Sequence, residues 1–264
     1  MKNTINNILI SLIFITFIFS SISYSEDAIS DIVSNEKTEK IREFFNSESA
    51  KTSINNIYPG GETLMMFAAA NNPNSEVIHL LASLGAGVNS KDELGLTPLM
   101  FAVTTNKNPG VTFALLQLGA NPNAVDSEGI SVLMYAARDA EPLIIETMLS
   151  KNFDVNEPAL SGWTPIMFAV ACNNSTRAAE LLLEAGAEVN ILNTDGMSPL
   201  MIAAKHTNNP EIVELLLRHS ADVTIITKGK MAIDFANNNP KLKGSSALRN
   251  LRTVTNLRIS EKVK

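Results

Sequence analysis

The chain has 264 residues, of which 45% are hydrophobic and 18% charged, so it is long enough for one elongated domain and is not wholly disordered. Its formal charge of −6 is unevenly placed: residues 226–264 hold nine Lys or Arg against two acids, which leaves −13 on residues 1–225. This acidic body argues against a chain that wraps nucleic acid, and the single cysteine, Cys172, excludes an intramolecular disulfide and a cysteine-only zinc site.

Residues 1–25 have the pattern of a secretory signal peptide. Lys2 supplies the positive charge, an apolar run covers Ile8–Phe19, and small polar residues follow up to Ser25. We expect cleavage after Ser25, with Ser23 as the second choice. The run is short for a membrane span, which needs about 20 apolar residues, so an uncleaved anchor is the less favoured alternative. The sequence thus predicts an exported bacterial protein, periplasmic or secreted, without membrane insertion after cleavage.

Residues 26–57 are predicted to form an N-terminal helical cap. A short helix is expected over Asp27–Val33, and an apolar stripe on a second helix includes Thr38, Ile41, Phe44 and Phe45. Charged residues around this stripe suit the outer face of an end repeat.

One phrase then recurs through the chain, with its best copy at Gly95–Ala102. Further copies begin at Gly61, Gly129, Gly162, Gly196 and, in degraded form, Gly229, at intervals of 34, 34, 33, 34 and 33 residues. A constant period in this range indicates a stacked array of repeats. Gly allows a turn, Thr or Ser can cap a helix, and Pro suits its first position, so each copy predicts the start of a helix.

A second apolar run follows each phrase after about 14 residues, for example Val77–Leu84, and its spacing is helical. Asn-rich and often Pro-containing segments separate the two helices and are predicted as turns. Three of the second helices end at a Gly-Ala pair, where Gly suits a left-handed cap.

The phrase and its tail resemble the ankyrin repeat, whose usual pattern is G-x-T-P-L-H-x-A-A followed by L-L-x-x-G-A-x-x-N. The tail appears here as G-A-G-V-N at Gly85–Asn89 and G-A-E-V-N at Gly186–Asn190. The resemblance implies an all-α solenoid of helix-turn-helix repeats with β-hairpin loops: about five full repeats plus caps over residues 58–252, with repeats starting near 58, 92, 126, 159, 193 and 226. Methionines stand where the family usually has His: Met66, Met100, Met134, Met167 and Met201. We expect them to fill apolar space and not to bind metal.

The sixth repeat is expected to act as a C-terminal cap, because Asp234 replaces a core residue of the phrase. Ser246, Leu248 and Leu251 predict its second helix. Residues 253–264 contain few apolar side chains and are predicted as a basic tail. Such a tail could contact anionic lipid or an acidic partner, although a solvated final helix is the simpler interpretation.

Catalytic motifs are missing from the sequence. It contains no zinc-protease motif, nucleophile elbow, phosphate-binding loop or EF-hand loop, and no cofactor or metal is expected. Cys172 and His206 fall just after the first helices of neighbouring repeats and suggest a thiol nucleophile, but no orienting third group is evident. We therefore expect a non-enzymatic protein and keep a thiol-dependent enzyme as a minor alternative.

The resemblance implies that a partner protein docks on a concave face formed by hairpin tips and the ends of the first helices. Apolar residues directly follow the phrase's Gly in four adjacent repeats (Leu96, Ile130, Trp163, Met197), and Leu94 and Leu160 add to the row. Trp163 would be an interface anchor; alternatively, these side chains only cover the neighbouring hairpin. In the sixth repeat the residue after the phrase's Gly is Lys230, which is also assigned to the surface. The polar rim is predicted to comprise Glu93, Glu128, Arg138, Asp139, Asp195, Lys205, His206 and Lys228. We expect a monomer that binds an unidentified protein in the envelope or, alternatively, acts as a secreted effector on host proteins.

Overall fold

The computed structural model describes residues 28–46, 53–106, 108–150, 153–173 and 175–262. The predicted signal peptide of residues 1–25, with its cleavage after Ser25, lies outside this part of the chain. Among the described residues, no helix combines the length and the apolar character needed to cross a membrane.

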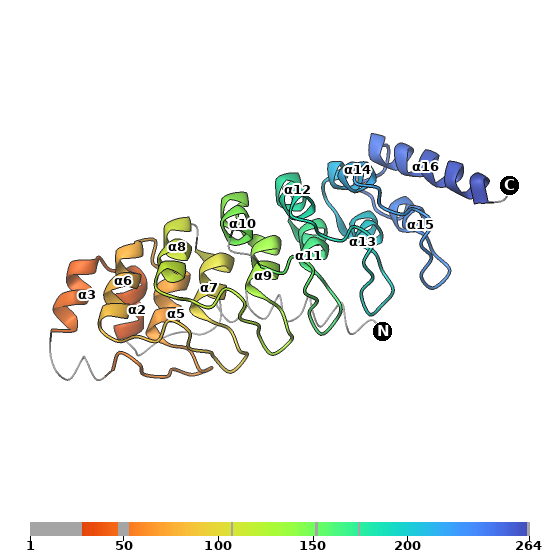
Figure 1. Cartoon of the computed structure of the whole chain (residues 1–264). Helices are drawn as coiled ribbons and strands as arrows, with labels where there is room; N and C mark the ends of the chain where they lie inside the picture. Colours follow the sequence, from red (N-terminus) through yellow and green to blue (C-terminus); the bar gives the residue numbers. More distant parts are fainter. Residues whose placement is uncertain (1–27, 47–52, 107, 151–152, 174, 263–264) are drawn as a thin grey trace.

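Short helices form two layers that run the length of the molecule (Figure 1). The inner layer contains α2 (Ala28–Asn35), α5 (Leu64–Asn71), α7 (Pro98–Thr105), α9 (Val132–Asp139), α11 (Pro165–Cys172), α13 (Pro199–His206) and α15 (Ala232–Asn237). The outer layer contains α3 (Thr38–Phe44), α6 (Ser75–Ser83), α8 (Pro109–Gln117), α10 (Pro142–Leu149), α12 (Thr176–Glu184), α14 (Pro210–Arg218) and α16 (Ser246–Lys262). Repeats 1 to 6 are the pairs from α5–α6 to α15–α16, and between repeats the chain forms hairpin fingers that project below the inner layer. The predicted all-α solenoid is confirmed.

The recurring phrase starts the inner helices as expected. The hydroxyl oxygens of Thr97, Ser131 and Ser198 accept hydrogen bonds from backbone N–H groups three residues later, at 3.3–3.4 Å. The preceding glycines have positive φ, for example +82° at Gly95, which a residue with a Cβ adopts only with strain. The turn and the cap together fix where α7, α9 and α13 begin.

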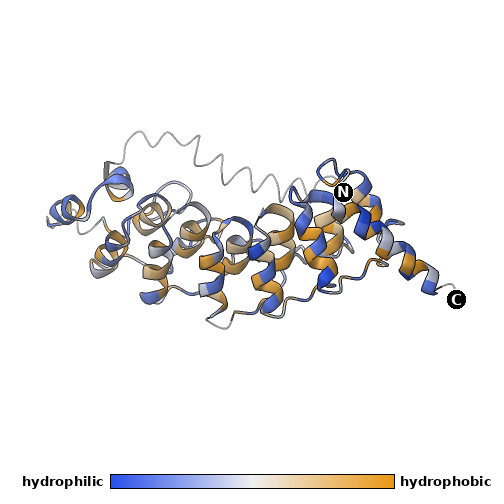
Figure 2. Cartoon of the chain, turned by 90° about the horizontal axis from the view of Figure 1, so that it is seen from above, coloured by the Kyte–Doolittle hydropathy of each residue, from blue (hydrophilic) through white to orange (hydrophobic). Residues whose placement is uncertain are grey.

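The core lies between neighbouring repeats, so the inner helices are apolar over most of their surface (Figure 2). The five recurring methionines are at most 1% exposed. In two of them the sulfur also accepts a weak hydrogen bond from the N-cap N–H: Met66 from Thr63 (3.4 Å) and Met134 from Ser131 (3.5 Å). Methionine therefore fills the stack and closes the helix start, which supports a packing role over metal binding.

Asparagines that follow the inner helices join each repeat to the one before it. The Nδ2 of Asn106 donates to the carbonyl oxygens of Ala69 (2.9 Å) and Asn72 (2.8 Å), and its Oδ1 accepts from the N–H of Asn108. The same arrangement recurs at Asn72, Asn173 and Asn239. We call these four residues the asparagine ladder. The segments predicted as plain turns therefore also bind adjacent repeats together.

Two members are missing from this ladder. Ala140 occupies the position in repeat 3 and has no side-chain donor, and Thr207 occupies it in repeat 5, where its Oγ1 accepts from the N–H of Asn209 at 3.1 Å. Helices α7 and α9, on either side of the first gap, also share less contact than α5–α7 or α9–α11. The boundary between repeats 2 and 3 is thus the less tightly joined one.

The two ends of the array are closed by helices. Asn72 bonds to the carbonyl oxygens of Val33 and Glu36, both at 3.0 Å, so α2 and α3 dock on repeat 1 much as one repeat docks on another. At the other end, residues 253–262 are not a separate tail: α16 continues through Lys262 and buries Thr255. The boundary predicted at 253 was wrong, because Thr255 lies one helical turn beyond buried Leu251 on the same face.

Candidate protein-binding surface

The hairpin turns align along one edge of the molecule, which we call the fingertip edge: residues 58–61, 92–95, 126–129, 159–162, 193–196 and 227–230. Each turn is closed by its own backbone, as where Gly95 N–H donates to the Asp92 carbonyl (3.0 Å). The carboxylate oxygen Oδ1 of Asp92 also accepts from the N–H groups of Leu94 (2.9 Å) and Leu96 (2.7 Å). Asp126 and Asn193 do the same in their turns.

Backbone hydrogen bonds connect consecutive fingertips. The N–H of Glu93 donates to Gly60 (3.0 Å), that of Ser127 to Leu94 (2.9 Å), that of Leu160 to Glu128 (3.0 Å) and that of Thr194 to Ser161 (3.2 Å). The Oγ1 of Thr227 completes the series by donating to the Asp195 carbonyl (2.9 Å). The edge is therefore continuous from repeat 1 to repeat 6, and its spacing is set by main-chain atoms up to repeat 5 and by the Thr227 hydroxyl at the last step.

The four apolar residues after the glycines are buried. Leu96, Ile130, Trp163 and Met197 are 6–8% exposed. The Trp163 ring lies 5.1 Å from the ring of Phe168, five residues later on α11, and Lys230 occupies the corresponding place 5.8 Å from the Phe235 ring. The expectation that this row is presented to a partner was wrong for these four side chains. All four belong to the buried core, and the Trp163 ring contacts Phe168 on the inner helix of its own repeat.

Other apolar side chains are exposed at the fingers. Leu94 is 46% and Leu160 74% exposed, as predicted for the row. Sequence reasoning missed Ile57, Leu192 and Ile226, which are 77%, 48% and 65% exposed and each directly precede a fingertip. The available signal was their common place in the repeat, one residue before the turn.

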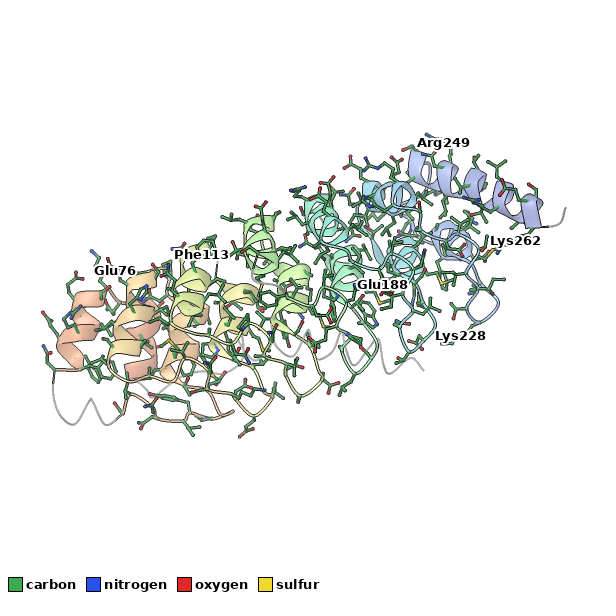
Figure 3. All side chains as sticks on the ribbon, viewed as in Figure 1. Glu76, Phe113, Glu188, Lys228, Arg249 and Lys262 are labelled. Atoms are coloured by element: carbon green, nitrogen blue, oxygen red, sulfur yellow. The ribbon has the colours of Figure 1, made fainter. Side chains whose placement is uncertain are left out.

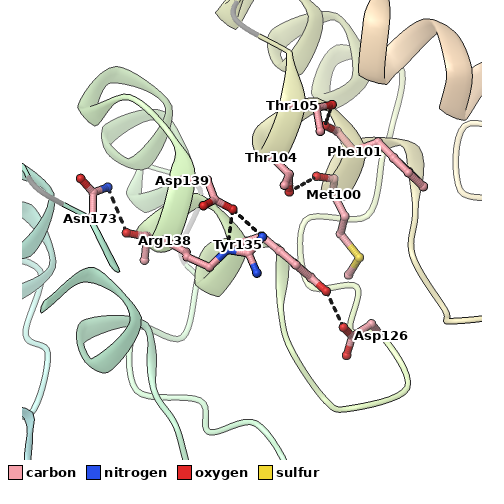
Figure 4. A network of polar contacts seen from close by, with 10 residues as sticks. Met100, Phe101, Thr104, Thr105, Asp126, Tyr135, Arg138, Asp139 and Asn173 are labelled. Carbon is pink, nitrogen blue, oxygen red and sulfur yellow. Dashed lines mark hydrogen bonds and ion pairs between the residues drawn. The ribbon is translucent and has the colours of Figure 1, made fainter. Parts of the chain in front are cut away.

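A network of polar contacts lies at the centre of the inner layer (Figure 4). The hydroxyl of Tyr135 donates to Asp126 Oδ2 at 2.6 Å, which ties α9 to its own fingertip. Burial, together with Asp126, raises the pKa of Tyr135, so the phenol keeps the proton it donates. Arg138 lies over the Tyr135 ring, 5.0 Å from its centroid, and pairs with Asp139 Oδ2.

Arg138 is only 7% exposed, so it is not the open rim charge that the sequence predicted. Its guanidinium is used inside the protein, stacked on Tyr135 and paired with Asp139. Desolvation raises the pKa of Asp139 even though Arg138 opposes the shift. The pair leaves little net charge at the middle of the surface.

Comparison with known families decides the identity of this array. A family model described as ankyrin repeats matches residues 29–126, 104–193 and 133–227. The chain belongs to the ankyrin-repeat family. No curated protein gives a significant match to the chain. The matches begin within α2, in agreement with the docking of α2 and α3 as a shortened repeat in front of repeat 1. Ankyrin repeats are typically non-catalytic and indicate a protein–protein interaction module.

Cys172 and His206 offer little support for thiol chemistry on this ankyrin array. Within the described part of the chain, no hydrogen bond joins them. Desolvation raises the pKa of the Cys172 thiol, which disfavours the reactive thiolate, although the residue as a whole is exposed. Burial and neighbouring Lys205 lower the pKa of His206 to about 4.

The C-terminal fingertips gather three lysines. Lys228 Nζ pairs with Asp195 Oδ1 at 3.1 Å, and Lys230 lies over Phe235. Desolvation lowers the pKa of Lys205, with Asp195 acting against it and Lys228 and Lys230 adding to it, so these charges influence one another. Figure 3 shows Lys228 at the last finger and Arg249 on the opposite, outer side.

Of the predicted surface, the exposed or half-buried members are Glu93, Leu94, Glu128, Asp139, Leu160, Asp195, Lys205, His206, Lys228 and Lys230. The fingers bring Glu93, Leu94, Glu128 and Leu160 into one line through the backbone bonds described above. That these residues contact a partner stays a prediction.

Proposed function

We propose that this protein is an exported, non-enzymatic ankyrin-repeat protein that binds a partner protein along its fingertip edge and the adjoining ends of the inner helices. One observation supports the proposal most directly. Hydrogen bonds of the backbone hold the fingertip edge in place, while some side chains on that edge are exposed and take no part in these bonds. Leu160, for example, is 74% exposed although its own N–H is part of the inter-finger series. An apolar side chain held this way is available for contact with a partner.

The mechanism is preorganisation. Because the fingers are joined through main-chain groups and the asparagine ladder, the surface needs little ordering when a partner docks. Little conformational entropy is then lost on binding, so more of the interaction free energy appears as affinity.

Export is part of the proposal and is supported by the pattern of residues 1–25. A periplasmic partner or inhibitor is favoured over a secreted effector of host proteins. Detecting the native protein in the periplasmic fraction or in the culture medium separates these two. If its mature N-terminus still begins at Met1 or Lys2, the protein is an anchored scaffold and the proposal of export by cleavage is wrong.

The binding surface is tested by in-cell crosslinking followed by capture of the tagged protein. We compare the wild type with Leu160→Asp and with Leu143→Asp, since Leu143 lies on the outer helix α10 and is also exposed, at 52%. We expect one crosslinked protein to be lost with Leu160→Asp and kept with Leu143→Asp. Trp163→Ala is unsuited to this purpose because Trp163 is buried and its loss alters packing.

Equal recovery of the crosslinked partner with the wild type and both variants would show that the interface lies outside the fingertip edge. The thiol-enzyme alternative requires a fast-reacting Cys172 at neutral pH. A slow reaction with a maleimide reagent, and unchanged capture by Cys172→Ser, would remove it.

A further inference from the structure

Charge changes sign along the fingertip edge. The tips of repeats 2 and 3 carry Asp92, Glu93, Asp126 and Glu128, and no Lys or Arg lies within those two turns. Glu93 and Glu128 are exposed. Asp92 and Asp126 use their carboxylates to close the turns, so Glu93 and Glu128 are the acids available to a partner.

The middle of the edge is uncharged. The repeat 4 tip, residues 159–162, contains no charged residue and exposes Leu160. At the end of α9 in the neighbouring repeat 3, Arg138 and Asp139 neutralise each other. An apolar position thus separates the acidic fingertips from those of repeats 5 and 6.

The far end is basic. Lys228 and Lys230 stand on the last fingertip and Lys205 at the end of α13, against the single carboxylate of Asp195. Because Asp195 pairs with Lys228, the positive charges of Lys205 and Lys230 are left without an ion-pair partner among the described residues. The hydrogen bonds between fingers place both charged ends on one continuous edge.

Resting on the proposed function, we propose that the partner contributes an extended segment of mixed charge: basic residues over repeats 2 and 3, an apolar side chain at Leu160, and acidic residues over repeats 5 and 6. Complementary charges fix the orientation of such a segment and speed its association.

The length of this segment can be derived from the repeat geometry. Helices pack about 8–10 Å apart, so the three repeat steps from Glu128 to Lys228 span roughly 30 Å. An extended chain covers about 3.3 Å per residue. The basic and acidic ends of the partner segment are therefore separated by about nine residues.

The test uses synthetic peptides and the whole protein in fluorescence anisotropy. The probe has a lysine pair and a glutamate pair separated by about nine uncharged residues with a central leucine. Peptides of the same length with only lysines or only glutamates are the controls. We expect the mixed peptide to bind about 5-fold more tightly than either control at low salt, and the difference to shrink as salt is added.

Charge-reversed variants locate the effect. Glu93→Lys with Glu128→Lys should weaken binding of the mixed peptide and favour the all-glutamate one, and Lys228→Glu with Lys230→Glu should favour the all-lysine one. Lys243→Glu with Arg249→Glu makes the same change in net charge as the Lys228 and Lys230 reversals, at two exposed residues outside the fingertip edge. This control should bind like the wild type.

The variant that combines all four fingertip reversals decides the matter. Its edge has the opposite polarity, so the mixed peptide can turn round and should regain most of its affinity, which structural damage would not allow. No preference for the mixed peptide, no recovery in the combined variant, or equal loss in the Lys243 and Arg249 control would each overturn the inference. The proposed function is judged separately, by the crosslinking of Leu160→Asp in cells.

Discussion

At the scale of single residues, the fingertip glycine Gly162 is required for two reasons at once. Gly162 has φ of +73°, and a Cβ built on it would lie 2.7 Å from the backbone nitrogen of Thr194 in the next finger. Gly186 also has positive φ, +94°, but nothing lies within 4 Å of its Cβ position. Substitution of Gly186 therefore tests the strain of positive φ alone, and substitution of Gly162 tests the same strain together with the close approach of the next finger.

Gly162→Ala is expected to lower the free energy of unfolding by about 2–4 kcal/mol, since it adds a backbone clash to the strain of positive φ. Gly186→Ala should lower it by about 1 kcal/mol, from strain alone. Urea unfolding followed by circular dichroism measures both. Equal losses in the free energy of unfolding for the two variants would show that the fingers can move apart to accept the added methyl group.

His206 gives the fold a pH dependence. Its pKa is lowered to about 4, mainly because burial disfavours the charged imidazolium. The unfolded chain, with a histidine pKa of about 6.5, then binds the proton first, so the stability that neutral His206 provides is complete above pH 6.5 and is lost as the pH falls toward 4. His206→Gln should flatten the stability profile between these values. A profile parallel to that of the wild type would contradict the shift.

At the scale of elements, helix positions could be predicted from the sequence because their causes are local. The Gly, the Ser or Thr cap and the first-turn Pro lie within a few residues of one another, and α7, α11 and α13 begin at their prolines as expected. The asparagine ladder was beyond this reasoning, since each amide bonds to carbonyls some 32 to 39 residues earlier. The contact of Trp163 was missed for another reason: Phe168 is only five residues away, but it lies on α11 while Trp163 precedes that helix, and the direction of the Trp163 ring follows from the fold.

Asn72 and Asn71 provide a matched test of the ladder. Asn72 is 2% exposed and bonds to two carbonyls of the N-terminal helices, whereas exposed Asn71 bonds only to Phe67 in its own helix. Asn72→Ala should destabilise the protein by about 1–3 kcal/mol, because two acceptors lose their donor. Hydrogen exchange should rise first in α2 and α3. Asn71→Ala should leave both quantities nearly unchanged, and similar behaviour of the two variants would rule out the inter-repeat role.

At the scale of the whole molecule, an array of this kind is as cohesive as its weakest junction. That junction lies between repeats 2 and 3, where Ala140 replaces the ladder asparagine and α7 and α9 share less contact. The spacing of the repeats along the array was predictable from the sequence period. The strength of this boundary was not, because Ala140 looks like an ordinary helix-end residue until its neighbours in the ladder are known.

Ala140→Asn is expected to stabilise the protein by about 1 kcal/mol, by adding the amide donor that Asn72, Asn106, Asn173 and Asn239 supply at their junctions. The backbone of Ala140 (φ −83°, ψ 159°) is extended like that of Asn106 (φ −82°, ψ 125°), so the amide can take a similar direction. Thermal unfolding should become sharper and shift upward. Ala140→Leu adds volume without a donor and should give no such gain; if it does, filling of space is the cause.

The fingertip turns are closed by main-chain groups and by one Asp or Asn in several of them. In the turns of repeats 2 and 4, Glu93 and Leu160 contribute backbone atoms to these bonds, whereas Thr194 in repeat 5 also donates through its side chain. Side chains such as Glu93 and Leu160 can therefore be exchanged without disturbing the stack. Selection can act on what this protein recognises with almost no effect on whether it folds. Its descendants can change partners while they inherit the same scaffold.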